Sequence, residues 1–409
     1  MLSNSLVLIT ALIVFIALIS NRLRNNQRWQ ATLTPLASII GSGFLVSVPI
    51  LAFEIGNWAI IGIIILITGA YFIGSVIRFN IRYAEPLFSQ PDTFKKHSLT
   101  LSLEKISQLL LAFAYFISIA YYLVLLGNFL LKGMGFENTL YAKIIASALL
   151  IAIGTAGICG GLSSVERVEK YAVAFNLAII AGLLVGLMFY NGEHLTNGTW
   201  HLANIKTPIS LHKIQVLLGL LIIVQGFETS RFLGDEYGAP TRISSMRQAQ
   251  LLSAVIYIVF FASITILFGF LQEDRSIAAV ISLVGHVALV LPLMLTLGAV
   301  ASQFGAAIAD SLGSAGLLED TSERYISVNH AYLIITVVAL AILWNTDVTQ
   351  IVTLASQAFA LFYLTQCGVA LAITCIEKEI PNRARKALGF SLVALLCLSV
   401  ILFGLPSNV

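Results

Sequence analysis

Charged residues are scarce in this chain. Of its 409 residues, 11% are Asp, Glu, Lys or Arg, whereas typical soluble domains have about 25%. Hydrophobic residues make up 58% of the sequence, and the mean hydropathy is +0.93. The apolar residues fall in long runs, and a run of about 20 such residues crosses a bilayer as a helix. The composition excludes a water-soluble protein and predicts an all-α, polytopic membrane protein.

The sequence also lacks the motifs of several other functional classes. Its four cysteines lie in apolar runs without a C-x-x-C pair, and its six histidines lack metal-ligand spacing. No H-E-x-x-H, paired-aspartate or Walker motif is present. A net charge of +3, with basic residues in short scattered segments, argues against nucleic-acid binding. We therefore expect a protein that is not an enzyme and has no cofactor, and whose partners are the lipid bilayer and a small molecule.

The hydropathy pattern predicts about twelve membrane spans, with boundaries good to a few residues. These spans are 3–20, 33–53, 57–77, 106–131, 141–160, 171–190, 213–231, 249–271, 284–312, 328–345, 349–376 and 387–404.

The basic residues predict how these spans are oriented. If the segment after the first span is cytoplasmic, 18 of the 23 Lys and Arg residues fall on the cytoplasmic side. This bias follows the positive-inside rule. It predicts extracytoplasmic N- and C-termini and a multi-pass protein of the plasma membrane, or of the inner membrane if the source is bacterial. The other side holds Lys132, Lys143, Lys206, Lys213 and Arg275.

Two of the expected spans contain a candidate helix break. The first is Gly41-Ser42-Gly43 in span 33–53, and the second is Gln225-Gly226, close to Glu228, in span 213–231. Each glycine lowers helix stability by about 1 kcal/mol, and a backbone group freed within lipid needs another partner. Breaks at corresponding places in two halves of a chain indicate a transporter site between inverted repeats. Close helix packing through small residues is the alternative.

These motifs resemble those of the amino acid–polyamine–organocation (APC) superfamily. Gly41-Ser42-Gly43 is similar to the Gly-Ser-Gly step of its first core helix, and Gly226-Phe227-Glu228 to its sixth-helix motif. The segment 235–245 resembles the acidic, proline-containing loop that follows, and 301–308 resembles the eighth helix. The resemblance implies a leucine-transporter-like fold, with a 5+5 inverted-repeat core whose first and sixth core helices are interrupted. It divides the chain into an extra N-terminal helix and linker (1–30), two repeats (31–190 and 191–376) and an additional C-terminal helix (377–409).

The resemblance also implies a secondary active transporter of an amino acid or related amine, working by alternating access. Free N–H groups around Ser42 and Gly43 could bind a carboxylate at a half-helix N-terminus, and carbonyls near Gln225 and Gly226 could accept from an ammonium. Polar side chains of the third and eighth core helices could add specificity, or could simply bond between helices. The candidate substrate-binding residues are Ser38, Gly41, Ser42, Gly43, Gln225, Gly226, Phe227, Tyr115, Ser302 and Gln303, with Ser118 and Tyr122 as further possibilities.

Intramembrane charges are the candidates for ion coupling. Glu228 could carry a proton, or could be an interfacial acid paired with Arg231. Asp310 could act in coupling or face the cytoplasmic interface. The resemblance places Asn176 where some proton-coupled relatives have lysine, so coupling through a lysine is not expected, and either a proton or sodium could be the coupling ion. A membrane-embedded enzyme, a channel and a ligand-binding sensor are the alternative functions.

Overall fold

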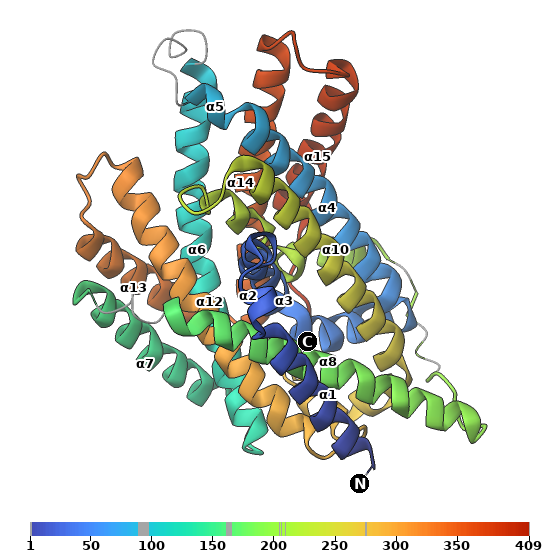
Figure 1. The fold of residues 1–409 in the computed structure, drawn as a ribbon. Coiled ribbons are helices and arrows are strands. Elements are labelled where there is room, and N and C mark those ends of the chain that lie inside the picture. Colours follow the sequence, from blue (N-terminus) through green and yellow to red (C-terminus); the bar gives the residue numbers. More distant parts are fainter. Residues whose placement is uncertain are drawn as a thin grey trace.

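The computed structural model describes residues 2–88, 98–160, 166–203, 205, 207–208, 210–274 and 276–408. Over these residues every regular element is an α-helix or a 3-10 helix (Figure 1). This confirms the all-α prediction. The elements are α1 (Leu2–Leu18), α2 (Asn21–Arg24), α3 (Gln27–Ile55), η1 (Gly56–Trp58), α4 (Ala59–Tyr83), α5 (Glu85–Phe88), α6 (Ser98–Gly133), α7 (Thr139–Ile158), α8 (Glu166–Thr196), α9 (Leu211–Leu218), η4 (Leu221–Val224), η5 (Phe227–Phe232), α10 (Ala239–Ile264), η6 (Thr265–Glu273), α11 (Val280–Val284), α12 (Leu291–Thr321), α13 (Val328–Asn345), α14 (Val348–Ile376) and α15 (Arg383–Phe403).

The helices account for the expected spans. Within the described ranges, nine helical segments are long and apolar enough to cross a membrane, and the longest of them, Gln27–Phe88, holds both α3 and α4. The 17-residue α1 and the broken segment from α9 to η5 correspond to the two remaining spans. The span expected over 284–312 was misplaced, because α11 ends at Val284 and α12 begins only at Leu291, with Pro292 in its first turn. Proline suits a helix start.

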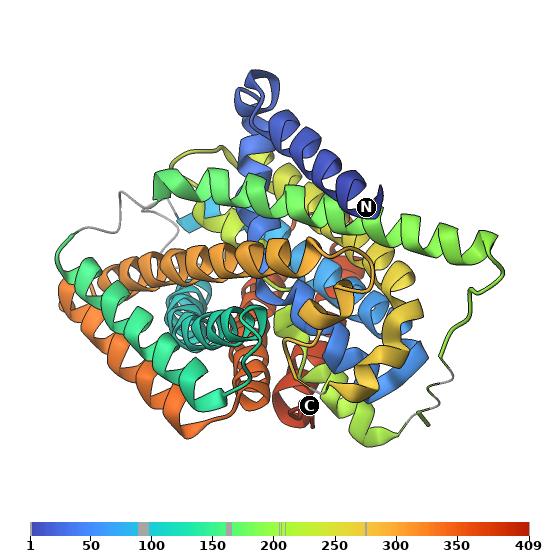
Figure 2. The same cartoon turned by 90° about the horizontal axis from the view of Figure 1, so that it is seen from below.

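The core helices pack in two groups, which we call the bundle and the scaffold. The bundle contains α3, α4, α10 and the broken segment from α9 to η5, and the scaffold contains α6, α7, α12 and α13. Figure 2 shows α6 end-on among α7, α12 and α13. Counted from α3, the core helices form two consecutive sets of five. The bundle contains the first and second helices of each set, and the scaffold contains the third and fourth. This equivalence of position is the arrangement expected of a 5+5 core.

The extra N-terminal helix packs on the fifth core helix. In Figure 2, α1 crosses α8. A Cβ atom on Gly182 would lie 2.9 Å from the carbonyl oxygen of Val7, and one on Gly186 would lie 2.8 Å from a methyl group of Val7. The two glycines of α8 therefore let α1 approach closely.

The break expected in the first core helix is absent. The helix α3 runs without interruption from Gln27 to Ile55, through all three residues of the Gly-Ser-Gly step. A Cβ atom on Gly43 would lie 2.4 Å from Cβ of Ile223, and one on Gly41 would lie 3.0 Å from Oγ of Ser302. The glycines thus allow close packing on the sixth core helix and on α12, and this packing outweighs their low helix propensity.

The sixth core helix is broken, as the sequence predicts. The α-helical part ends at Leu218, two 3-10 turns follow, and Gly226 separates them with φ of +115°. Glycine is the residue that readily adopts this backbone conformation. Side chains satisfy the freed backbone groups: Ser356 accepts from the amide of Ile222 at 2.9 Å, and the Tyr257 hydroxyl donates to the carbonyl of Ile223 at 2.5 Å.

Candidate functional site

A cavity lies beside the broken helix, between α3, α8 and α12. It encloses about 620 Å³ of space that continues to the outside. Five neutral polar side chains and one carboxyl group line it among apolar residues. The lining residues are Thr34, Ala37, Ser38, Ile40, Ala172, Val173, Asn176, Leu177, Thr229, Ala301, Ser302, Gly305, Ala306, Ala309 and Asp310.

A second, smaller cavity adjoins the first and shares part of its wall. Ile40, Asn176 and Ser302 line both, and Gly41, Gly43 and Gln303 are found in the lining of the second. Seven sequence candidates therefore come together at the two cavities: Ser38, Gly41, Gly43, Asn176, Ser302, Gln303 and Asp310. The side chain of Ser42 lies outside the described part of the structure.

The expected backbone ligands are not available to a substrate. Because α3 is continuous, no half-helix N-terminus forms at Ser42 and Gly43. The carbonyl of Gly226 accepts from the Thr229 hydroxyl at 2.8 Å and from the Thr229 amide at 3.3 Å. Any recognition at these cavities therefore depends on side chains more than on the free backbone groups that the sequence suggested.

Glu228 lies behind the break and not in the cavity. Its side chain is fully buried, and its Oε2 accepts from the Tyr363 hydroxyl at 2.7 Å and from the Gly226 amide at 3.0 Å. Its Oε1 has no hydrogen-bond partner in the described structure. Although Glu228 follows the break closely, its neighbour Thr229 lines the cavity and Glu228 does not.

The remaining candidates from the sixth core helix are also buried. The ring of Phe227 stacks on that of Tyr363, with centroids 5.4 Å apart, and Gln225 donates to the hydroxyl of Tyr122 at 3.3 Å. Neither of these candidates is found among the residues that line the two cavities. Glu228, Tyr363, Gln225 and Tyr122 form a buried polar cluster behind the break, and Phe227 packs on it.

Asp310 connects the cavity to this polar cluster. It is buried and lines the cavity, so it does not simply face the cytoplasmic interface. It accepts a hydrogen bond from Ser118 of α6, whose hydroxyl also contacts the carbonyl of Tyr115 at 3.0 Å. The charges of Asp310 and Glu228 both act on Tyr115. Two acidic groups therefore lie in the neighbourhood of the same tyrosine.

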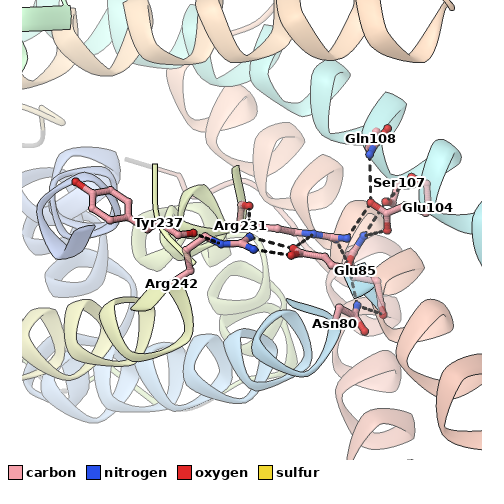
Figure 3. A network of polar contacts seen from close by, with 9 residues as sticks. Asn80, Glu85, Glu104, Ser107, Gln108, Arg231, Tyr237 and Arg242 are labelled. Carbon is pink, nitrogen blue, oxygen red and sulfur yellow. Dashed lines mark hydrogen bonds and ion pairs between the residues drawn. The ribbon is translucent and has the colours of Figure 1, made fainter. Parts of the chain in front are cut away.

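Arg231 does not pair with Glu228, which rules out the simplest structural role of that acid. Instead the Arg231 guanidinium lies 2.9 Å from Glu104 of α6 and 3.6 Å from Glu85 of α5. It also donates to Gln366 of α14. Arg242 of α10 binds the other oxygen of Glu85 at 2.7 Å and the carbonyl of Arg231 at 2.7 Å (Figure 3).

This buried polar network joins the bundle to α6 and α14. Gln366 donates to Glu104 at 3.1 Å and to Ser107 at 2.7 Å, and Asn80 of α4 donates to Gln366 at 2.8 Å. Sequence reasoning missed Glu104 and Gln366, although polar residues at or inside a span are a recognisable signal. It also missed Tyr363, which lies in α14, because polar candidates outside the broken helices were sought in the third and eighth core helices.

The comparisons with known proteins place this architecture in a family. A profile of the APC superfamily transporters matches residues 21–404. An uncharacterized protein of Aquifex aeolicus (strain VF5) is 38% identical over 404 residues, which cover 98% of this chain and 97% of that protein. Two solved structures of Mhp1 align with 92% of this chain and 90% of their own. The inward-facing conformation is 13% identical with a TM-score of 0.46. A closed conformation, described as a nucleobase-cation-symport-1 family transporter with bromovinylhydantoin bound, is 14% identical with a TM-score of 0.41. The family match over nearly the whole chain shows that this multi-pass membrane protein belongs to the APC superfamily of transporters.

Proposed function

We propose that this transporter carries a small organic solute, an amino acid or related amine, through the cavity between α3, α8 and α12. The observation that carries the proposal is the chemistry of the lining: Asp310 is acidic, and no lysine, arginine or histidine is found among the described residues that line the cavity. An ammonium group would be attracted to Asp310, because opposite charges interact strongly where water is excluded. The hydroxyls of Ser38 and Ser302 and the amide of Asn176 could donate to a carboxylate.

We propose further that transport proceeds by movement of the bundle against the scaffold. The cavity is lined by the first halves of α3 and α8, which the charge bias predicts to be cytoplasmic. Beyond it, Gly43 packs closely on Ile223, and the rings of Phe44 and Phe260 stack with centroids 4.2 Å apart. These contacts would close the opposite side, so the cavity would face the cytoplasm in this conformation. Both moving units would contain helices from each of the repeats 31–190 and 191–376, and the protein would lie in the plasma membrane.

Glu228 is our first candidate for proton coupling. It is an acid at the helix break, it has no basic partner in the described structure, and it shares the neighbourhood of Tyr115 with the cavity residue Asp310. A proton taken up or released there would change the charge next to the break. Such a change could bias the packing of the broken helix between two arrangements.

The test begins with a thermal-shift screen of the detergent-purified protein against amino acids, amines and organic ions. A ligand at a hundredfold excess over its dissociation constant should stabilise the protein by about 2.7 kcal/mol. Uptake of that ligand into liposomes should saturate, and Asn176→Leu should abolish it. Asn345→Leu is the matched control, since Asn345 is exposed and bonds only within its own helix, to Ala341 at 2.8 Å.

Other outcomes would identify other functions. Binding without flux would indicate a sensor, and flux that does not saturate would indicate a channel. Chemical conversion of the ligand would indicate an enzyme. Normal uptake by the Asn176→Leu protein would remove the proposed cavity from the transport path.

A further inference from the structure

An apolar groove runs along the outside of the bundle between α4 and α10. Its walls are Ile64, Ile67, Thr68, Tyr71 and Phe72 of α4 and Gln250, Leu251, Ala254 and Ile258 of α10. On each helix these residues recur every three or four positions, so each set forms one face. Phe72 is 54% exposed and Leu251 is 49% exposed. In a membrane-spanning bundle, such exposed apolar side chains face the lipid.

Two arginines stand at one end of this groove. Arg78 continues the groove face of α4, two turns after Tyr71, and its guanidinium lies 4.9 Å from the centre of the Tyr71 ring. Arg247 lies one turn before Gln250 on α10 and is exposed, and its charge acts on Arg78. The charge bias predicts that this end of both helices is cytoplasmic.

The arginine pair has no counter-charge in the described part of the chain. The two buried arginines nearby, Arg231 and Arg242, are both paired with Glu85, whereas none of the ion pairs among the described residues includes Arg78 or Arg247. Two neighbouring positive charges repel each other, so an anion bound between them is favoured. The groove therefore combines an apolar channel with a cationic end.

Hydrogen bonds to residues of the groove walls fix the position of Arg78. Its guanidinium donates to Oε1 of Gln250 and, at 3.3 Å, to the carbonyl of Tyr71. Gln250 in turn donates to the carbonyl of Ala70 at 2.8 Å. Gly74 makes room for the Gln250 side chain, since a Cβ atom on Gly74 would lie 2.5 Å from the Gln250 amide. The arginine is thus held in place on the wall of the groove before any ligand arrives.

The dimensions suit one leaflet of a bilayer. From Ile64 to Arg78 the helix rises by roughly 21 Å at 1.5 Å per residue, and the apolar part up to Phe72 takes up roughly 12 Å of that. Half of the hydrocarbon core of a bilayer is about 15 Å thick. An acyl chain lying in the groove would therefore place its phosphate near the two arginines.

We propose that the groove between α4 and α10 is a binding site for an anionic phospholipid, with the phosphate between Arg78 and Arg247 and one acyl chain against Tyr71, Phe72 and Leu251. Basic pockets between membrane helices on the cytoplasmic side recognise anionic head groups in this way. Because α4 and α10 both belong to the bundle, the lipid would join two helices of the part that we propose to move. The site does not depend on the identity of the transported solute.

Lipid binding is tested on the detergent-purified full chain by native mass spectrometry and by thermal shift. Phosphatidylglycerol should remain bound and raise the melting temperature, whereas phosphatidylcholine at the same concentration should do so weakly. Each of Arg78→Gln and Arg247→Gln should weaken phosphatidylglycerol binding roughly fivefold, the usual contribution of a basic residue beside an anionic membrane surface. Arg78→Lys should retain much of it.

The controls separate this site from general attraction of charge. Arg22→Gln removes the same single charge from α2 and should leave binding unchanged. Ala254→Phe fills the groove but keeps both arginines, and should weaken binding of phosphatidylglycerol. Equal binding of the two lipids, full binding by the Arg247→Gln protein, or equal stabilisation by inorganic phosphate alone would overturn the proposal. Because Arg247 is exposed, that variant remains informative even if Arg78→Gln does not fold.

Discussion

The hydroxyl of Tyr363 on α14 donates to the Oε2 atom of Glu228 at 2.7 Å, so a residue of the tenth core helix holds the acid that follows the break in the sixth. If Glu228 carries the coupling proton, Glu228→Gln should still bind substrate and exchange it between two loaded compartments, because glutamine keeps the size and an acceptor oxygen. It should lose accumulation driven by a pH gradient, because glutamine cannot ionise. Liposome assays with and without the gradient measure the two activities separately.

Glu236→Gln is the matched control, since it removes the same charge from an exposed loop position and should change neither activity. If Glu228→Gln protein accumulates substrate like the parent, with the same pH dependence, Glu228 is not the coupling residue. Asp310 would then be the next acid to test.

The close contact between Gly43 and Ile223 predicts that α3 tolerates no side chain there. Gly43→Ala should lower the free energy of unfolding by about 1–3 kcal/mol, the usual effect of overpacking. Gly316→Ala in α12 has no atom within 4 Å of its new Cβ, and it should raise stability by up to about 1 kcal/mol because alanine favours the helix. Thermal unfolding in detergent distinguishes the two. A stable Gly43→Ala protein that has lost ligand binding would instead make Gly43 a site residue.

The two ion pairs that α6 makes near its N-terminal end should differ strongly in strength. The side chains of Arg231 and Glu104 are 6% and 9% exposed, whereas those of Lys105 and Glu323 are 64% and 72% exposed. Arg231→Gln leaves Glu104 buried without its cation and should cost about 3–5 kcal/mol. Lys105→Gln should cost about 0–1 kcal/mol. Similar melting temperatures for the two variants would show that water reaches the Arg231 network.

Some features of this fold could be predicted because single residues determine them. The break at Gly226 depends on a backbone conformation that glycine adopts readily, and the spans follow from the length of each apolar run. The Gly41-Ser42-Gly43 step was ambiguous for a physical reason. Glycine favours both helix breaks and close helix contacts, and only the position of Ile223 in space decides between them.

The site was predicted in part for the same reason. Polar residues and glycines within spans could be identified, and five polar residues and two glycines of those chosen line the two cavities. The direction in which Glu228 points could not be predicted from the sequence, because it depends on Tyr363, which is 135 residues further along the chain. Contacts between distant segments carry no local signal in a single sequence.

Membrane topology gives a prediction that does not depend on any ligand. Reporters fused to the N- and C-termini should both be found on the extracytoplasmic side, because 18 of the 23 basic residues then lie in the cytoplasm. Alkaline phosphatase, active only outside the cytoplasm, and green fluorescent protein, fluorescent only inside, give opposite readouts. A fluorescent C-terminal fusion would mean that one segment does not cross the membrane.

The segment after α15 is tied to the end of α3 through Glu54. Oε1 of Glu54 accepts from the Ser407 hydroxyl at 2.6 Å and from the Asn408 amide at 3.0 Å. Both Glu54 and Ser407 are buried, and the nearby Leu405 amide donates to the carbonyl of Gln215 in α9 at 3.0 Å. Glu54→Leu leaves the Ser407 hydroxyl buried without its acceptor, which should cost about 1–3 kcal/mol.

A double-mutant cycle isolates this contact from general effects of each substitution. Ser407→Ala alone leaves Glu54 with the Asn408 amide and should destabilise the protein less than Glu54→Leu does. In the Glu54→Leu protein, Ser407→Ala should cost nothing further, or should recover stability, because it removes the unsatisfied hydroxyl. Thermal unfolding of the four proteins gives the coupling energy. Strictly additive effects would show that Glu54 and Ser407 do not interact, and that the segment after α15 is held to α3 and α9 by its other contacts.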